Sequence, residues 1–340
     1  MLRVGGKEKG TNMSIQHIQR EPTRTPPKGA ASPRAVMFGE AMLELSNVSD
    51  DQAILGVAGD TFNTATYMSR LGHRVAYMTG LGIDPFSARV RHAADEEDIE
   101  THLIATVPGK VVGAYAISLD RAGERSFTYW RSASAARSFF DCEEASSIFQ
   151  TAANADLLYL TGISLSLYSA ENRSLITNLM RQMRENDRWI AFDSNYRPAG
   201  WDSVESARSA IQEAVSLSQI SLPTFEDEAA LFGDRYPEAT AERHIKLGAR
   251  EVVVKCGERG AFVADFGWVA PERIVEPVDT TGAGDSFNGG YLASRLDGLP
   301  PHRAAHIGNQ LAAAVLGTKG AILPKQHTLF ERRVSKQATG

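Results

Sequence analysis

Residue types and spacing suggest chemistry most clearly at residues 279–287, which read Asp-Thr-Thr-Gly-Ala-Gly-Asp-Ser-Phe. A β-branched run precedes this stretch and a helix of small residues is predicted to follow it, which places Gly282 and Gly284 at a helix N-terminus. Unpaired backbone N–H groups and the positive end of the helix dipole attract an anion there. Asp285 would repel that anion, yet a carboxylate in this position can take a proton from an attacking hydroxyl group. The alternative is that Asp285 only caps the helix, but the length of the motif favours a catalytic carboxylate.

A second candidate site is the segment Ala-Gly-Asp-Thr-Phe-Asn, which precedes and opens a predicted helix. Asp60 and Asn63 lie about one helical turn apart, so both side chains can hydrogen-bond a polyol from one side of the helix start. Gly59 stands immediately before them. A plain helix cap with a solvated asparagine explains the same residues equally well.

A predicted hairpin carries a third candidate, in which Tyr115 lies on one strand and Tyr129 and Arg131 lie on the other. Residues two apart on a strand point to the same face. An arginine beside a tyrosine is suited to binding a carboxylate, because the guanidinium fork matches it with two hydrogen bonds. Cross-strand aromatic packing is the alternative, and the triplet Tyr129-Trp130-Arg131 alone favours it.

Two further polar loops, at residues 193–198 and 255–260, follow predicted strands. The first loop brings together an acid, an amide and a guanidinium, and the second has glycines at both ends of a tight turn. In an open α/β sheet, ligands bind beyond the carboxyl ends of the strands, so both loops are candidates. An Asx-turn and a hairpin turn with solvated charges are the alternatives.

Composition excludes several classes of function. The sequence has neither a Gly-x4-Gly-Lys-Ser/Thr phosphate loop nor a Gly-x-Gly-x-x-Gly after its first strand. A net charge of -5 gives no reason to expect a nucleic acid or an anionic membrane as partner. Cys142 and Cys256 are far apart and in no metal-binding spacing, which suits a reducing cytoplasm. No apolar run approaches the length of a membrane span.

The order of predicted elements indicates the fold. Strands and helices alternate from residue 157 onward, which is typical of an α/β protein with a mostly parallel sheet between two helical layers. Amphipathic strands at about 42–57 and 107–131 do not fit that sheet and predict a small β-sheet lid. Residues 273–278 are predicted to be a further strand. We expect one domain at 34–328, a disordered extension at 1–33 and a flexible tail at 329–340.

Residues 279–287 closely resemble the C-terminal signature of the ribokinase-like (PfkB) carbohydrate kinases. The segment with Gly59, Asp60 and Asn63 resembles the substrate-binding segment near the N-terminus of that family. The resemblance covers about residues 35–325 and implies a three-layer α/β/α sandwich with a β-sheet lid. Residues 59–65, 129–136 and 193–198 resemble 2-keto-3-deoxygluconate kinases in particular.

The resemblance implies ATP-dependent phosphorylation of a sugar acid on its 6-hydroxyl, with Mg²⁺ and in some relatives a monovalent cation such as K⁺. Asp285 would be the base. It also implies a homo-oligomer, a dimer through the lid or a higher assembly. The other implied roles are the anion hole (backbone of Gly282, Ala283, Gly284), the substrate contacts (Gly59, Asp60, Asn63, Tyr115, Tyr129, Arg131, Arg197), the nucleotide contacts (Asn195, Lys255, Gly257, Gly260, Asn309), the water-mediated Mg²⁺ contact (Glu226) and the monovalent cation (Asp279, Thr281).

One segment departs from the family pattern. The family usually has Asn-x-x-Glu near the metal and the phosphates, whereas the matching stretch here begins with Pro223 and ends with Glu226. The glutamate remains and the asparagine is lost, so its contact must be absent or made by another residue. A fructokinase or ribokinase is the alternative within this class, and a non-catalytic sugar sensor is the alternative outside it.

Overall fold

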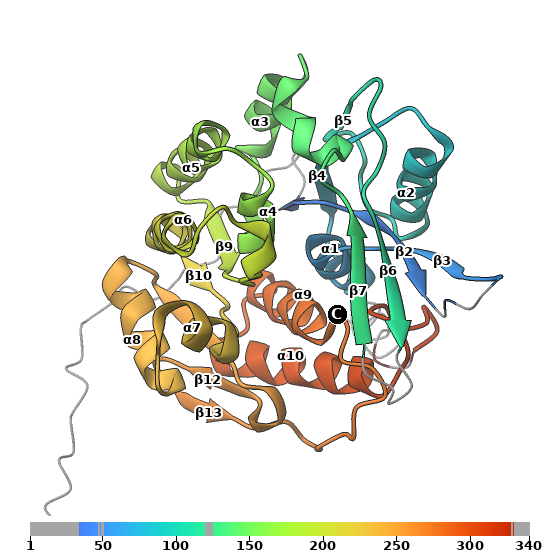
Figure 1. Ribbon diagram of the computed structural model, residues 1–340. Coiled ribbons are helices and arrows are strands. Elements are labelled where there is room, and N and C mark those ends of the chain that lie inside the picture. The colour runs from blue at the N-terminus through green and yellow to red at the C-terminus, as the bar shows by residue number, and fades with distance from the viewer. Residues whose placement is uncertain (1–33, 47, 49–50, 120–124, 328, 330–340) are drawn as a thin grey trace, which may run out of the picture.

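The computed structural model describes residues 34–46, 48, 51–119, 125–327 and 329. The predicted extension at 1–33 lies outside these residues, as does the predicted tail from 330 onward. Leu329 is described and packs against the hydrophobic core. A nine-stranded sheet runs through the middle of the molecule in the order β13-β12-β11-β10-β9-β8-β1-β4-β5 (Figure 1).

Most of this sheet is parallel, and only the two pairings that involve β12 are antiparallel. The predicted mostly parallel sheet is thus confirmed. The strands are β1 (Ala35–Phe38), β4 (Val75–Leu81), β5 (Ile104–Thr106), β8 (Leu157–Thr161), β9 (Trp189–Asp193), β10 (Ile220–Ser221), β11 (Glu251–Lys255), β12 (Ala261–Val263) and β13 (Gly267–Val269).

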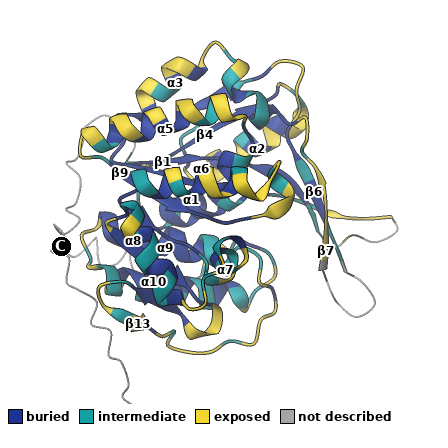
Figure 2. Ribbon diagram, turned by 60° about the vertical axis from the view of Figure 1, so that its left-hand side comes forward, coloured by how far each residue is buried: buried dark blue, intermediate teal, exposed yellow. Residues whose placement is uncertain are grey.

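Helices cover both faces of the sheet, because side chains of a buried strand alternate between two apolar cores. On β1, Met37 belongs to one core and Phe38 to the other. Figure 2 shows buried residues along the sheet and exposed ones on the outer sides of the helices. One core receives α1 (Asp60–Arg70), α2 (Pro85–Glu96), α9 (Ala283–Leu296) and α10 (Pro301–Leu316); the other receives α3 (Ala145–Ala152), α4 (Gly162–Ser166), α5 (Ala170–Glu185), α6 (Val204–Leu217), α7 (Phe225–Phe232) and α8 (Pro237–Leu247).

A separate four-stranded sheet forms the predicted lid, in the order β3-β2-β6-β7. Its strands are β2 (Met42–Ser46), β3 (Ile54–Ala58), β6 (Ala114–Leu119) and β7 (Arg125–Trp130). Residues 107–113 lie outside the lid strands, so the lid sheet begins later in the second insertion than the pattern suggested. β2 pairs in parallel with β6, and the two hairpins are antiparallel.

The predicted strand at 273–278 is wrong. No strand is assigned there within the described chain, and Ile274 and Val278 are largely exposed. The backbone N–H groups of Val278 and Asp279 donate to the carbonyl of Leu316 at the end of α10, so this segment crosses a helix end and joins no sheet. Two of its β-branched residues, Ile274 and Val275, line a cavity and take no part in a strand ladder.

Candidate active site

A cavity of about 670 Å³ lies between the lid sheet and the carboxyl ends of the central strands. Residues far apart in the sequence meet in it, as predicted for an open α/β sheet. All the predicted site residues except Asp279 line it: Gly59, Asp60, Asn63, Tyr115, Tyr129, Arg131, Asn195, Arg197, Glu226, Lys255, Gly257, Gly260, Thr281, Gly282, Ala283, Gly284, Asp285 and Asn309.

The start of α9 supplies the anion-binding geometry. Gly282 caps the helix in the left-handed region, with a φ of 75°, and a Cβ added there would lie 2.6 Å from the Cβ of Ala321. Only glycine tolerates both constraints. The Ala283 N–H donates to the Thr280 carbonyl at 3.4 Å. Since the first N–H groups of a helix lack partners within the helix, the amide of Gly284, the next residue, is the better candidate donor to an anion.

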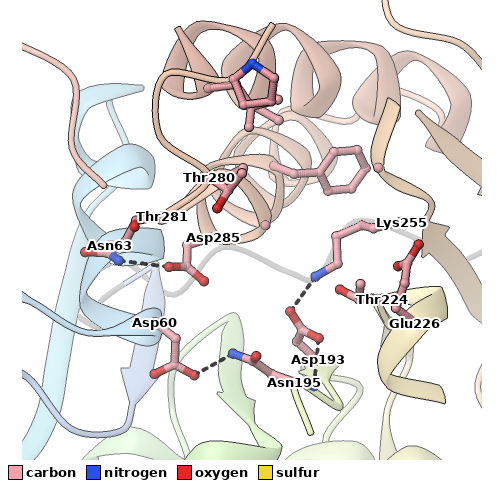
Figure 3. Close-up of a pocket in the computed structure, with 18 of the residues that line it drawn as sticks. Asp60, Asn63, Asp193, Asn195, Thr224, Glu226, Lys255, Thr280, Thr281 and Asp285 are labelled. Carbon is pink, nitrogen blue, oxygen red and sulfur yellow. Dashed lines mark hydrogen bonds and ion pairs between the residues drawn. The ribbon is translucent and has the colours of Figure 1, made fainter. Parts of the chain in front are cut away.

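Asp285 lies one turn from this helix start, on the cavity wall, and its Oδ2 accepts a hydrogen bond from Asn63 Nδ2 at 2.8 Å (Figure 3). Burial and, after it, the negative charge of Asp60 raise the pKa of Asp285, while Asn63 and Lys255 lower it; the net result is a pKa of about 7. A carboxyl group with this pKa exchanges a proton near neutral pH, which is what a general base requires.

Asp60, at the first position of α1, links two parts of the cavity. Its Oδ2 accepts hydrogen bonds from Thr161 Oγ1 at 2.6 Å and from Asn195 Nδ2 at 3.1 Å. Asn195 adopts a positive φ of 30°, and its N–H donates to Asp193 Oδ1 at 3.1 Å. The predicted substrate residue Asp60 and the predicted nucleotide residue Asn195 are therefore in direct contact.

Lys255, at the end of β11, is the buried cation of the cavity wall. Its Nζ lies 2.5 Å from Asp193 Oδ2 and donates to Asn288 Oδ1 at 3.2 Å. A Cβ added to Gly284 would lie 3.7 Å from this Nζ, so the ammonium group stands beside the helix start. Figure 3 shows Lys255 facing Asp193 across the cavity from Asn63 and Asp285. Asn288 was not predicted to be a site residue, although its position three residues after Asp285 puts it one turn along the same helix.

The lid contributes aromatic and charged groups. Tyr115 and Tyr129 stand opposite each other on β6 and β7, with ring centroids 5.7 Å apart. The Tyr115 hydroxyl donates to Glu44 of β2. Arg131 forms an ion pair with the buried Glu40, which follows β1 and was not predicted to be a site residue. The hairpin thus shows the aromatic packing of the alternative interpretation, and Arg131 lines the cavity, whereas its role as partner of a substrate carboxylate stays a prediction.

Arg197, a predicted substrate residue, lies in the loop after β9 and lines the cavity. Its Nη1 lies 3.0 Å from both carboxylate oxygens of Asp227 in the first turn of α7. Burial acts to lower the pKa of Arg197, but Asp227 outweighs it, and the net effect is to raise it. Arg197 is therefore already neutralised in part by a carboxylate neighbour.

The end of the cavity near α10 is apolar. Pro271, Val275 and Leu316 line it. Asn309 lies beside them and donates from Nδ2 to the carbonyl of Val269 at 2.8 Å, so its amide is fixed. Gly260, with a φ of 84°, lies against Asn309. A flat ring fits an apolar slot of this kind better than a sugar does.

Two predicted cation sites differ in geometry. Glu226 is exposed on the cavity wall and available to a ligand. Asp279 is buried, and its carboxylate oxygens accept from the N–H groups of Thr281 at 2.8 Å and Gly320 at 2.9 Å. The described residues contain no group of three or more His, Cys, Asp or Glu that could hold a metal by themselves.

The three layers, the lid and a cavity with an acidic side at a helix N-terminus define an enzyme class that handles a polyol together with an anionic ligand. The family model described as "pfkB family carbohydrate kinase" matches residues 32–328. The chain therefore belongs to the pfkB family of carbohydrate kinases, and the resemblance seen in its motifs is confirmed.

Individual relatives and structures agree with this assignment. The chain is 37% identical over 305 residues to the 2-dehydro-3-deoxygluconokinase of Escherichia coli K12, covering 87% of this chain and 98% of that protein. It is 38% identical over 298 residues to the enzyme of the same name from Dickeya dadantii, covering 85% and 96%. The PfkB protein from Polaromonas sp. JS666 superposes with a TM-score of 0.75 at 27% identity, covering 90% of this chain and 100% of that chain.

Fructokinases are also similar to the chain. A fructokinase from Vibrio alginolyticus is 27% identical over 258 residues, covering 75% of this chain and 81% of that protein. The crystal structure of fructokinase from Vibrio cholerae O395 in fructose, ADP and calcium ion bound form gives a TM-score of 0.75 at 25% identity, covering 88% and 98%. No described helix has the length and apolarity needed to cross a membrane.

Proposed function

We propose that this protein transfers the γ-phosphoryl group of ATP to the 6-hydroxyl of 2-keto-3-deoxygluconate, also called 2-dehydro-3-deoxygluconate. The observation that carries the proposal is the position of Asp285, whose pKa is raised to about 7 at a glycine-rich helix start. The similarity to enzymes named 2-dehydro-3-deoxygluconokinase, at 36–38% identity, supports the choice of sugar acid.

In this proposal, Asp285 accepts the proton of the 6-hydroxyl group. The oxygen of that hydroxyl group attacks the γ-phosphorus of ATP, and the bond from the γ-phosphorus to the ADP oxygen breaks. The backbone N–H of Gly284 and the ammonium of Lys255 stabilise the negative charge on the phosphoryl group in flight. Asp60 and Asn63 hold the sugar hydroxyls. Phosphoryl transfer depends mainly on such positioning and charge neutralisation, because the protein forms no covalent bond.

In this proposal, the nucleotide occupies the end of the cavity near α10. Its base would occupy the apolar slot beside Asn309 and Gly260, and its phosphates would extend past Gly257 and Lys255 toward Asn195. Mg²⁺ usually takes one or two protein carboxylates together with substrate phosphates and water, and the exposed Glu226 fits that pattern. When bound, Mg²⁺ would neutralise phosphate charge.

The monovalent cation, the oligomer and the location are also proposals. Asp279 and Thr281 remain the candidate K⁺ loop, although the carboxylate of Asp279 already accepts two backbone N–H groups. A homodimer through the lid would cover the exposed Phe127 and Trp130, and light scattering of the purified protein tests it. Both cysteines, Cys142 and Cys256, are free, which supports a reducing cytoplasm.

A fructokinase-like activity is the second candidate, because one structural observation favours it. Arg131, the proposed partner of the substrate carboxylate, is paired with Glu40. A neutral sugar would therefore meet no unpaired positive charge at this end of the cavity. A non-catalytic sugar sensor is disfavoured by the raised pKa of Asp285.

The proposal is tested by incubating the purified protein with ATP, Mg²⁺ and 2-keto-3-deoxygluconate. Formation of ADP is followed with a coupled assay, and the product is examined by ³¹P and ¹³C NMR. We expect one phosphate ester, located on carbon 6. Phosphorylation of another carbon would refute the proposed pose, and absence of any ester would refute the proposed substrate.

A further inference from the structure

Glu40 occupies an unusual place for a glutamate. It follows β1 and Gly39, lines the cavity, and leaves 1% of its side chain exposed. Its ion-pair partner is Arg131, which follows the last lid strand and keeps 19% of its side chain exposed. A buried carboxylate is costly unless it is paired. This carboxylate therefore needs a cation here, and Arg131 is the cation that the described chain places against it.

The neighbouring backbone leaves room for this pair. A Cβ added to Gly113 would lie 2.7 Å from Glu40 Oε1 and 3.2 Å from the Cβ of Arg131. A Cβ added to Gly59 would lie 2.3 Å from the backbone oxygen of Glu40. Two glycines from different elements thus permit the close approach of the β1 end, the α1 start and the lid, which indicates a built arrangement.

Neither carboxylate oxygen of Glu40 makes a hydrogen bond within the described residues. Its interaction with Arg131 is therefore one of charge. The negative charge of Glu40 also acts on the buried hydroxyls of Tyr77 and Tyr168, whose pKa values are raised well above normal, first by burial. The charge of Arg131 also acts on Asp60, whose pKa is raised, first by burial, and which Arg131 lowers.

We propose that Glu40 is a positioning residue for the sugar acid: it holds one side of the Arg131 guanidinium, so that the exposed side meets the substrate carboxylate in a fixed orientation. An arginine fork has donors on two edges, and a partner on one edge limits the directions of the other. The inference rests on the proposed function. It explains how an already paired arginine can still select an acid, by orientation and not by unpaired charge.

The test compares two substrates that differ at one carbon, 2-keto-3-deoxygluconate and its neutral counterpart 3-deoxyfructose, in which a hydroxymethyl group replaces the carboxylate. Glu40→Gln keeps the shape of the side chain and removes its charge. We expect it to raise KM for the acid about tenfold with less than about a twofold change in kcat, and to leave KM for 3-deoxyfructose within about twofold.

A double-mutant cycle separates positioning from a general structural role. If Glu40 acts through Arg131, then Glu40→Gln in an Arg131→Ala background changes KM for the acid by less than about twofold, because coupled residues are not additive. Should Glu40→Gln fold poorly, Glu40→Asp keeps the charge and withdraws it by one methylene. We expect Glu40→Asp to raise KM for the acid about threefold or more at unchanged kcat.

Three outcomes overturn the inference. The first is that the wild-type protein phosphorylates the acid but Glu40→Gln leaves KM for the acid unchanged or lowers it. In that case the proposed function survives. The second is an equal loss on both substrates, or the same loss in the Arg131→Ala background. The third is a wild-type protein that does not phosphorylate the acid, which also overturns the proposed function.

Discussion

The pH dependence of kcat/KM offers a quantitative test of Asp285, because this ratio reports the ionisation of the free enzyme. Burial and the charge of Asp60 raise the pKa of Asp285 to about 7. Only the ionised carboxylate accepts a proton. About 9% of the molecules are ionised at pH 6 and about 91% at pH 8, so the rate should rise about tenfold between these values and then level off.

Two substitutions should move this inflection in opposite directions. Asn63→Ala removes a hydrogen bond that favours the ionised form of Asp285, so the inflection moves to higher pH. Asp60→Asn removes a neighbouring negative charge, so the inflection moves to lower pH. The assay is a coupled ADP measurement from pH 5.5 to 9, with sugar held well below KM.

The control is Asp285→Asn, which should lower kcat by about 10²–10⁴-fold and abolish the inflection. Its fold should be preserved, as checked by circular dichroism and ATP binding. The reasoning is refuted if Asp285→Asn retains the wild-type profile, or if the two neighbouring substitutions shift the inflection in the same direction.

Three further predictions concern the scaffold. Gly282→Ala should reduce kcat and the melting temperature, because this residue has a positive φ and the new Cβ would clash with Ala321. Gly233→Ala, at a φ of 79° with open space around it, should lower the free energy of unfolding by only about 1 kcal/mol and keep kcat. Equal losses in the two variants would contradict this. Lys255→Met should lower the free energy of unfolding by about 3–5 kcal/mol by leaving a buried carboxylate unpaired, and a smaller loss in urea unfolding would count against that pairing. Burial alone would raise the pKa of Glu228, but His244 and Arg243 lower it to about 2. Its contribution, about 3 kcal/mol, is therefore present above pH 4.5 and lost as pH falls toward 2; Glu228→Gln should lack it, and an unfolding free energy equal to wild type at pH 7 would refute the assignment.

Local motifs explain why much of the site could be predicted from the sequence. In residues 279–287, a helix start, its glycines and its acid are neighbours in the chain, so their geometry follows from backbone rules alone. The alternation of strands and helices likewise predicts which loops meet, because parallel strands end at the same edge of a sheet. The segment at 193–198 was predicted in this way.

Other features depend on contacts between distant segments. Glu40 is a single glutamate after a strand, and nothing near it in the sequence indicates that Arg131 of the lid will pair with it. The extended run at 273–278 has strand composition but lies against the end of α10, where no strand is available to pair. Asn288 is hidden in a helix of ordinary pattern. Tertiary packing decides all three cases, and local propensity does not report it.

The most direct test of the central claim is the ratio of kcat/KM for 2-keto-3-deoxygluconate to that for D-fructose and for D-ribose, measured with saturating ATP and Mg²⁺. Buried polar groups that match one substrate reject another that leaves them unpaired. The proposed function predicts a preference for the acid of at least about 100-fold over both neutral sugars. Equal or higher efficiency with fructose or ribose would contradict it.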